Sequence, residues 1–327
     1  MRVAITGAAG FLGGAVARLH QAAGHEVVAL SRGGADLADV EERPGDLCDR
    51  AYVNLALAGA DMVQHIAAKV GTFGRWEEFE ANNVTATTNL LTAAAYQGAK
   101  GFVYCSSPSV VFCGQPIRGG DERLPLAPLS YSTYSRSKAL AEVRVAALAR
   151  EVGLPALILR PHLIWGPGDR HLLPGLLAAT RGGLLPKPWA RDPRVDPTHV
   201  SDAARAHLLA TDYLMETRPV SVDVLFITGA EVVSAFDMAA RLIQAAEGRR
   251  PRFFGVPAVL MSAAGRVGEI ACQARGYRRE PALSRFVVQS LLHDQWFSCE
   301  AASRILGYEP QTSISEGLAQ LTRSRTS

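Results

Sequence analysis

Residues 6–13 read T-G-A-A-G-F-L-G, and this glycine turn constrains the fold more than any other segment. A short apolar run at residues 3–6 leads into it, and residues 10–23 carry apolar side chains at helical spacing. A buried strand, a tight turn and a helix are therefore expected at the N-terminus. The helix would face the turn with the positive end of its dipole, which favours phosphate groups.

The three glycines of the turn have separate structural roles. Gly7 permits the tight bend, Gly10 lets backbone N–H groups approach a pyrophosphate, and Gly13 lets the helix pack closely on the strand. In a strand–turn–helix context this combination predicts a dinucleotide site. The residues predicted to contact the cofactor here are Thr6, Gly7, Gly10, Phe11, Leu12 and Gly13.

Strand-like and helix-like segments alternate through the first half of the chain. The buried strands expected after the turn, and the clearest helices between them, are residues 26–30, 62–66, 101–105 and 156–159, and residues 84–97 and 135–151. Alternation at this spacing predicts a Rossmann-type α/β fold, a doubly wound parallel sheet with helices on both faces.

The composition and pattern of the sequence change beyond residue 161, where glycine, proline and helical segments dominate. We expect a smaller, mainly helical substrate domain there, interleaved with the end of the sheet. Residues 1–165 and 195–230 are assigned to the dinucleotide-binding domain. Residues 166–194 and 231–327 are assigned to the substrate domain.

Composition and charge exclude several classes of protein. Of the 327 residues, 48% are hydrophobic and 20% are charged, an ordinary balance for a globular chain. A net charge of +3, with scattered basic residues, gives no reason to expect a nucleic-acid partner. Five cysteines without a C-x-x-C pair argue against a disulfide framework or a zinc site. We therefore expect no metal and a cytoplasmic location.

The end of the second predicted strand bears on the choice of cofactor. NAD-preferring sites place an acidic residue there. Here Ser31 and Arg32 follow the strand, and the nearest acid, Asp36, comes later. Ser31 can donate to a 2′-phosphate and Arg32 can pair with it, so we expect NADP(H), with NAD(H) as the alternative. Asp46 and Leu47, after the next short strand, are expected beside the adenine.

Tyr134 and Lys138 form a Y-x-x-x-K motif at the start of a predicted helix, one turn apart on one face. An ammonium beside a phenol favours the phenolate and lowers the pKa of the tyrosine. Tyr134 could then exchange a proton with a carbinol oxygen near neutral pH, and Lys138 could also donate to the nicotinamide ribose. The strand at residues 101–105 ends in Ser106 and Ser107, where a hydroxyl could hold the substrate oxygen. We favour Ser107.

Together these motifs resemble the extended short-chain dehydrogenase/reductase family, and the resemblance covers nearly the whole chain. It implies a nicotinamide cofactor and a catalytic set of Ser107, Tyr134 and Lys138. Members of the family often form homodimers through the two helices that here begin near Val84 and Ser135. A homodimer is therefore an expectation by analogy.

Two further segments match patterns of the same family. Residues 65–68 (H-I-A-A) match its H-x-A-A segment, which lines the cofactor cleft. Asn83 matches its N-V-x-G-T-x-N helix, with Ala86 in place of the usual glycine, and is expected behind the active site. The remaining cofactor contacts that the resemblance implies are Ala67, Pro161 and Leu163.

Within the family the chain is most similar to the branch of 3β-hydroxysteroid dehydrogenases. Residues 164–169 (I-W-G-P-G-D), residues 281–286 and Trp296 look more like its 2-alkyl-3-ketoacid reductases of long-chain olefin biosynthesis, which are NADPH-linked. The resemblance thus implies a ketoreductase that converts a long-chain 2-alkyl-3-ketoacid to the 3-hydroxy product. A sterol dehydrogenase and a nucleotide-sugar epimerase or dehydratase are the alternatives.

The nearest approach to a membrane-spanning segment is residues 253–264, which end before Arg266 and Glu269 and are too short to span. We expect a core or substrate-cleft helix there, and contact with a membrane surface is left open. The side chains expected to contact an apolar or amphiphilic substrate, or to pack in the domain core, are Phe253, Phe254, Val256, Val259, Leu260 and Met261.

Overall fold

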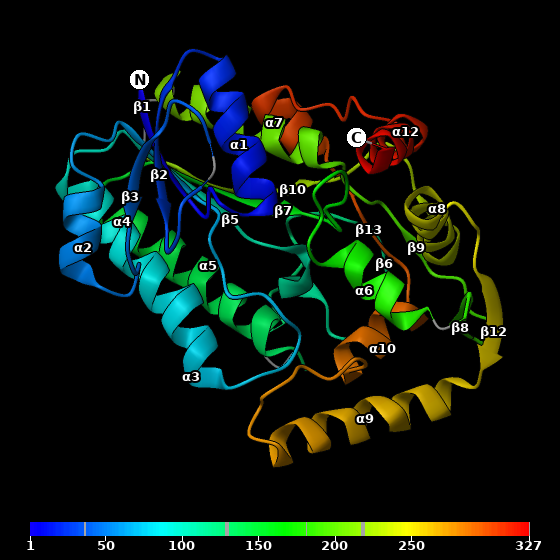
Figure 1. Ribbon diagram of the computed structural model, residues 1–327. Helices are drawn as coiled ribbons and strands as arrows, with labels where there is room; N and C mark the ends of the chain where they lie inside the picture. Colours follow the sequence, from blue (N-terminus) through cyan, green and yellow to red (C-terminus); the bar gives the residue numbers. More distant parts are fainter. Residues whose placement is uncertain (36, 128–130, 181, 217–219, 327) are drawn as a thin grey trace.

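The computed structural model describes residues 1–35, 37–127, 131–180, 182–216 and 220–326 (Figure 1). Seven parallel strands form the central sheet, in the order β10-β7-β5-β4-β1-β2-β3. Their bounds are β1 Arg2–Thr6, β2 Glu26–Ser31, β3 Glu41–Pro44, β4 Met62–His65, β5 Gly101–Cys105, β7 Ala156–Pro161 and β10 Val222–Ile227.

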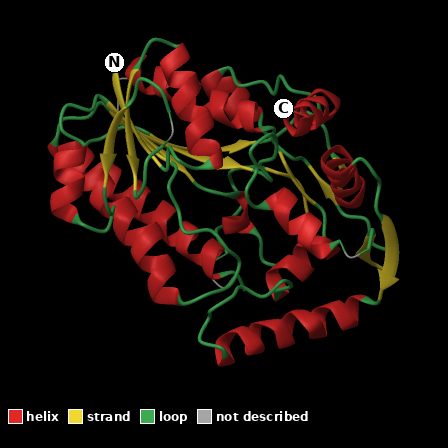
Figure 2. Ribbon diagram, viewed as in Figure 1, coloured by secondary structure: helices red, strands yellow, loops and turns green. Residues whose placement is uncertain are grey.

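Helices cover both faces of this sheet (Figures 1 and 2). One face packs on α1 (Phe11–Ala22), α7 (Val200–Glu216) and α11 (Glu300–Leu306), and the other packs on α2 (Arg50–Ala56), α4 (Ala86–Tyr96) and α5 (Thr133–Val152). Alternate strand residues point to opposite faces, as Val3 and Ala4 do in β1. The predicted doubly wound α/β fold is confirmed.

Short strands and helices make up the rest of the described chain. Strands pair in the order β11-β9-β13-β6 in one small sheet and β12-β8 in another. The bounds are β6 Ile117–Gly120, β8 Leu184–Pro188, β9 Arg194–Val195, β11 Val233–Ser234, β12 Arg252–Val256, β13 Gln295–Phe297, α3 Trp76–Phe79, α6 Leu172–Ala179, α8 Ala235–Glu247, α9 Ala258–Ala274, α10 Arg285–Leu292 and α12 Ile314–Thr326. Strand β6, from the first half of the chain, pairs with β13 near its end, so the first and second halves of the chain interleave. The predicted domain boundaries stay a prediction.

The expected helix at residues 253–264 is wrong in its first part. Residues 252–256 form β12, which pairs in parallel with β8, and α9 begins only at Ala258. Pro257 separates the two elements, because proline has no backbone N–H to continue a strand ladder but tolerates the start of a helix. Of the residues expected to contact substrate or to pack in the core, Met261 is buried, whereas Phe253, Phe254, Val259 and Leu260 are exposed. Packing in the core is therefore confirmed for Met261 and wrong for those four, and contact with a substrate stays a prediction. Within the described ranges, no helix is long and apolar enough to cross a membrane.

Candidate active site

The glycine turn joins β1 to α1 at the carboxyl edge of the sheet. Gly7 has a φ of +71°, which glycine adopts without strain, and its N–H donates to the carbonyl oxygen of Leu30 at 2.9 Å. A Cβ at Gly13 would lie 2.1 Å from the carbonyl oxygen of Gly7, so glycine alone permits this approach of α1 to β1. The first turn of α1 continues with Phe11 and Leu12, whose side chains are apolar. No carboxylate stands in this turn to repel an anion, and its N–H groups have no partner within the helix. They therefore suit an anionic pyrophosphate.

Thr6 lies beneath this turn rather than beside it. Its side chain is fully buried, and Oγ1 accepts hydrogen bonds from the N–H groups of Ile66 and Ala67, each at 3.0 Å. Oγ1 also lies 2.9 Å from Nδ1 of His65. Burial, with a smaller effect of Lys138, lowers the pKa of His65 to about 3, so the ring is neutral. Ala67 borders the glycine turn, and its contact with the cofactor stays a prediction, whereas the Thr6 side chain supports the turn from behind.

Tyr134 and Lys138 lie in the first turns of α5, and Ser107 follows β5. Nζ of Lys138 donates to the carbonyl oxygen of Cys105 at 2.6 Å and lies 4.1 Å from the centre of the Tyr104 ring. This bond ties the start of α5 to the last residue of β5, two positions before Ser107. The structure therefore brings the three predicted catalytic residues to one edge of the sheet.

Burial changes the proton affinity of both α5 residues. Desolvation lowers the pKa of Lys138 to about 8, although Cys105 and Glu142 oppose the shift. Desolvation, with a smaller effect of Cys105, raises the pKa of Tyr134 above its ordinary value. The sequence led us to expect a lowered pKa for Tyr134, and that direction is wrong because burial raises the pKa instead. Tyr134 is consequently protonated at neutral pH, the form that donates a proton.

Ser107 and Ser106 differ in their surroundings. Oγ of Ser107 accepts a hydrogen bond from the N–H of Ser109 at 3.2 Å, which leaves its own hydrogen available for another oxygen. The N–H of Ser106 donates to the carbonyl oxygen of Leu159 at 2.6 Å, and its buried hydroxyl has no partner among the residues that the structure describes. Because Ser107 is only partly buried, it is the better placed of the two to meet a substrate.

Asn83 lies in a π-helical turn, Glu80–Thr85, which replaces the predicted start of the helix at residue 84. Its Nδ2 donates to Oγ of Ser137 at 2.8 Å, and its Oδ1 accepts from the N–H of Lys69 at 2.7 Å. Ser137 in turn donates to the carbonyl oxygen of Tyr134 at 2.7 Å. Asn83 therefore acts on the backbone of the active site through Ser137, in the place expected for it.

Ser31 and Arg32 stand next to the glycine turn, because Thr6 and Leu30 are partners in the parallel register of β1 and β2. The Arg32 side chain is exposed and makes no hydrogen bond or ion pair to a described residue. Oγ of Ser31 donates to the carbonyl oxygen of Gly33. The guanidinium of Arg32 is thus available to a phosphate beside the turn.

The acidic groups near Ser31 and Arg32 lie on β3 and after it. Oε1 of Glu42 accepts the N–H of Ala35 at 2.7 Å, a contact that sequence reasoning missed because the register of β3 sets it. Asp36 lies outside the described residues. Asp46 is exposed, its Oδ1 accepts a backbone N–H two positions on at 2.9 Å, and Leu47 is half-buried. Both follow β3 as expected.

The segment after β7 carries backbone strain. Pro161 is buried at the end of the strand, and Leu163, two positions on, is exposed with a φ of +42°. A branched side chain rarely adopts this left-handed conformation, which persists where the surroundings fix it and which clusters at ligand sites. Nδ1 of His162 bonds to the buried carboxylate of Asp196, which also accepts the N–H of Phe297 at 2.8 Å. No spacing pattern in the sequence predicts the pairing of His162 with Asp196.

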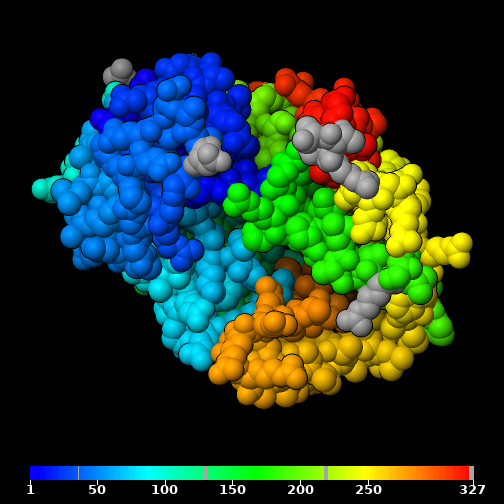
Figure 3. Space-filling model, viewed as in Figure 1, coloured from blue at the N-terminus to red at the C-terminus, as the bar shows by residue number. Residues whose placement is uncertain are grey.

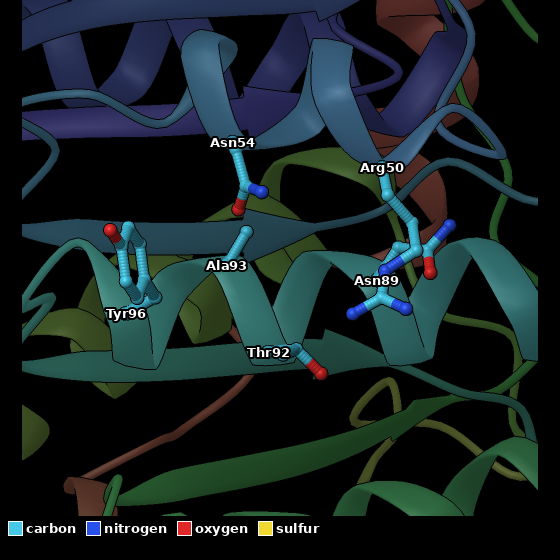
Figure 4. Close-up of a pocket in the computed structure, with 6 residues that line it drawn as sticks. All are labelled: Arg50, Asn54, Asn89, Thr92, Ala93 and Tyr96. Carbon is cyan, nitrogen blue, oxygen red and sulfur yellow. The ribbon is translucent and has the colours of Figure 1, made fainter.

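The space-filling face is hollowed between the blue N-terminal part, the green segment and the orange segment (Figure 3). A separate hollow of about 150 Å³ lies between α2 and α4, lined by Arg50, Asn54, Asn89, Thr92, Ala93 and Tyr96 (Figure 4). It contains none of the predicted site residues. Among the described residues, no group of three or more His, Cys, Asp or Glu side chains could hold a metal ion.

Comparisons with known proteins agree with this geometry. The model of the NAD dependent epimerase/dehydratase family matches residues 3–221. The chain is 35% identical to a 2-alkyl-3-oxoalkanoate reductase of Stenotrophomonas maltophilia, over 99% of each chain. It is 31% identical to a 3β-hydroxysteroid dehydrogenase/Δ5→4-isomerase of Mycobacterium tuberculosis, over 98% of this chain and 89% of that one. The solved structure of MoeE5 in complex with UDP-glucuronic acid and NAD matches with a TM-score of 0.75 at 26% identity, over 100% of this chain and 99% of that one.

Proposed function

The chain belongs to the NAD dependent epimerase/dehydratase family of extended short-chain dehydrogenases/reductases, and we propose that it reduces the keto group of a long-chain 2-alkyl-3-ketoacid with NADPH. The bond between Lys138 and Cys105 carries the proposal, because it ties the helix that holds Tyr134 to the end of the strand that Ser107 follows, at the edge of the sheet where the glycine turn lies. The full-length similarity to a 2-alkyl-3-oxoalkanoate reductase supports the substrate class.

Each catalytic side chain has a task in the reduction, in which the ketone gains a hydride at carbon and a proton at oxygen. The bound nicotinamide supplies the hydride. Tyr134, held in its protonated form by burial, donates the proton to the oxygen as that atom gains charge. Ser107 holds the same oxygen through its free hydroxyl hydrogen. Lys138 carries positive charge at neutral pH, since its pKa is about 8, and this charge favours release of the proton from Tyr134.

Arg32 supports NADPH as the reductant. Its exposed guanidinium follows β2 next to the glycine turn, where a 2′-phosphate can accept a paired, charge-assisted hydrogen bond. The carboxylate of Glu42, which stands on the adjacent strand, is engaged by the N–H of Ala35. A site for the 2′-phosphate is therefore compatible with the charges around Arg32.

An aromatic pair, Phe112 and Phe286, supports a substrate with alkyl chains. Phe112 ends the 3-10 turn that begins directly after Ser107, and it meets Phe286 of α10 edge to face, with ring centres 5.8 Å apart. Thr72 holds the segment before α10 in place, because its Oγ1 lies 2.9 Å from Oγ of Ser284. An aromatic pair between the segment after Ser107 and α10 is compatible with a substrate that carries alkyl chains.

The proposal is tested by following nicotinamide absorbance with purified protein and a long-chain 2-alkyl-3-ketoacid, in parallel cuvettes with NADPH and NADH. We expect consumption of NADPH well above that of NADH, and a rate lowered about 100-fold or more with Tyr134→Phe. Turnover of 3β-hydroxysterols in the oxidative direction, without reduction of the ketoacid, would assign the chain to the sterol dehydrogenases instead. Binding of NADPH without turnover of either substrate would overturn both assignments.

A further inference from the structure

Helix α9 is apolar on the side that faces solvent as well as on the side that faces the protein. Met261, Gly265, Glu269 and Cys272 point inward and are buried. The exposed side carries the apolar residues Val259, Leu260, Ala263, Val267, Ile270 and Ala274. A surface helix of a globular protein normally presents polar residues to solvent. The outer side of α9 therefore has the composition of a contact surface.

The apolar surface continues from α9 onto β12 and the loop after β8. Phe253 and Phe254 of β12 are exposed, and the indole of Trp189 lies over Gly255, where an added Cβ would come 2.0 Å from its Nε1. We call this surface the α9 patch, and its large members, 37% to 78% exposed, are Trp189, Phe253, Phe254, Val259, Leu260, Val267 and Ile270. Single exposed apolar residues are ordinary, whereas a contiguous patch marks an interaction site.

Contacts behind α9 hold the patch in a fixed orientation. Gly265 and Gly268 let the helix approach the backbone of residues 283–285 so closely that added Cβ atoms would come within 3.1 and 2.8 Å of it. Oε2 of Glu269 accepts from Nε of Arg285 at 2.6 Å. The helix lies along the outer edge of the molecule, at the bottom of Figure 1, with α10 above it in this view.

Positive charge is concentrated around the patch. Residues 247–285 contain eight arginines and three glutamates, a net charge of +5 in a chain whose total is +3, so the rest of the chain carries −2. Glu269, one of those glutamates, is buried on the inner side of α9 and pairs with Arg285. Arg266, Arg275 and Arg278 are exposed on α9 and the turn after it. An apolar helix face bordered by arginines is typical of helices that lie on membranes with anionic lipids.

We propose that the α9 patch docks the protein on the surface of a membrane that contains anionic lipids. With 17 residues α9 is shorter than the about 20 needed to span a bilayer, so it would lie in the plane of the interface. A second copy of the chain is a poorer occupant, because two facing α9 patches would bring their arginines together.

Vesicle co-sedimentation tests the proposal with the full chain and no substrate, so its result is independent of the proposed function. Vesicles of phosphatidylcholine are compared with vesicles that also contain phosphatidylglycerol. We expect binding to the anionic vesicles that weakens with added salt. The double variant Val267→Glu/Ile270→Glu should lower the affinity at least about tenfold, because two apolar side chains leave the interface. Leu55→Glu changes an apolar residue that is 76% exposed on α2 and serves as the matched control, with unchanged binding.

The charge and the apolar face are tested separately. Arg278→Gln should weaken binding to anionic vesicles about fivefold. Absence of binding by the wild-type protein would overturn the proposal, as would equal binding of wild type and the double glutamate variant. A dimer of the wild-type protein that the double variant loses, without vesicle binding, would assign the patch to a second copy instead. Circular dichroism of each variant establishes that the fold is retained.

Discussion

Replacing Lys138 by methionine removes an ammonium whose burial destabilises the fold by an amount that depends on pH. Lys138 is only 1% exposed, and burial lowers the pKa of its ammonium from 10.5 to about 8. Since the folded pKa lies below the unfolded value, the unfolded chain binds the proton more tightly. The stability of the wild-type protein relative to Lys138→Met therefore rises as pH increases through this window.

The size of this effect follows from the two pKa values. Their separation corresponds to roughly 3 kcal/mol of destabilisation when the lysine is protonated in both states. Nearly all of it is present at pH 7, and about half or less is left at pH 9.5. The free energy of unfolding of the wild type, minus that of Lys138→Met, should thus increase by about 2 kcal/mol between these two pH values.

Urea unfolding of both proteins at pH 7 and pH 9.5 measures the difference, with equal slopes against denaturant as the check that both unfold comparably. Lys100→Met provides the control, because the Lys100 side chain is 57% exposed, and its difference from wild type should be the same at both pH values. A Lys138→Met difference that stays constant within about 0.5 kcal/mol would refute the reasoning, since buried and exposed lysines would then behave alike.

Three further substitutions test the site. Tyr134→Phe should lower kcat about 100-fold or more while NADPH still binds, as a cofactor titration would establish; an unchanged kcat would remove Tyr134 from the mechanism. Gly13→Ala should weaken NADPH binding at least about tenfold, because the new Cβ would lie 2.1 Å from the carbonyl oxygen of Gly7. Gly175→Ala is the control and should leave the Kd for NADPH unchanged, because its Cβ would have no described atom within 4 Å. Arg32→Ala should reduce the preference for NADPH over NADH about tenfold, measured as the ratio of kcat/KM values; an unaltered ratio would contradict its role.

The sheet and the glycine turn could be predicted because local patterns determine them. Apolar runs of strand length, separated by helical spacing, mark a doubly wound sheet, and Gly13 occupies a place where a Cβ has no room. The strand–helix boundary at Pro257 was missed, because the apolar run 253–264 has no period that distinguishes the two elements. Only the parallel pairing with β8 determines that residues 252–256 form a strand.

Contacts between distant segments determine the features of the site that could not be predicted from the sequence. Thr6 looks like a cofactor ligand in the motif, but its hydroxyl is taken up by the backbone of Ile66 and Ala67, sixty and more positions away. The direction of the pKa shift of Tyr134 depends on its burial, and the ammonium of Lys138 donates to the carbonyl oxygen of Cys105. Such partners follow from the packing of α5 on β5, which residue spacing alone does not encode.

Hydride transfer is the central claim, and an isotope label tests it most directly. The protein is incubated in ordinary water with NADPH that carries deuterium on the transferred position of the nicotinamide ring, together with a long-chain 2-alkyl-3-ketoacid. The account predicts a 3-hydroxyacid with one deuterium at C3, found by mass spectrometry, and about 100-fold or more slower formation of it with Tyr134→Phe. A product without deuterium at C3, or recovery of unchanged ketoacid from protein that binds NADPH, would contradict it.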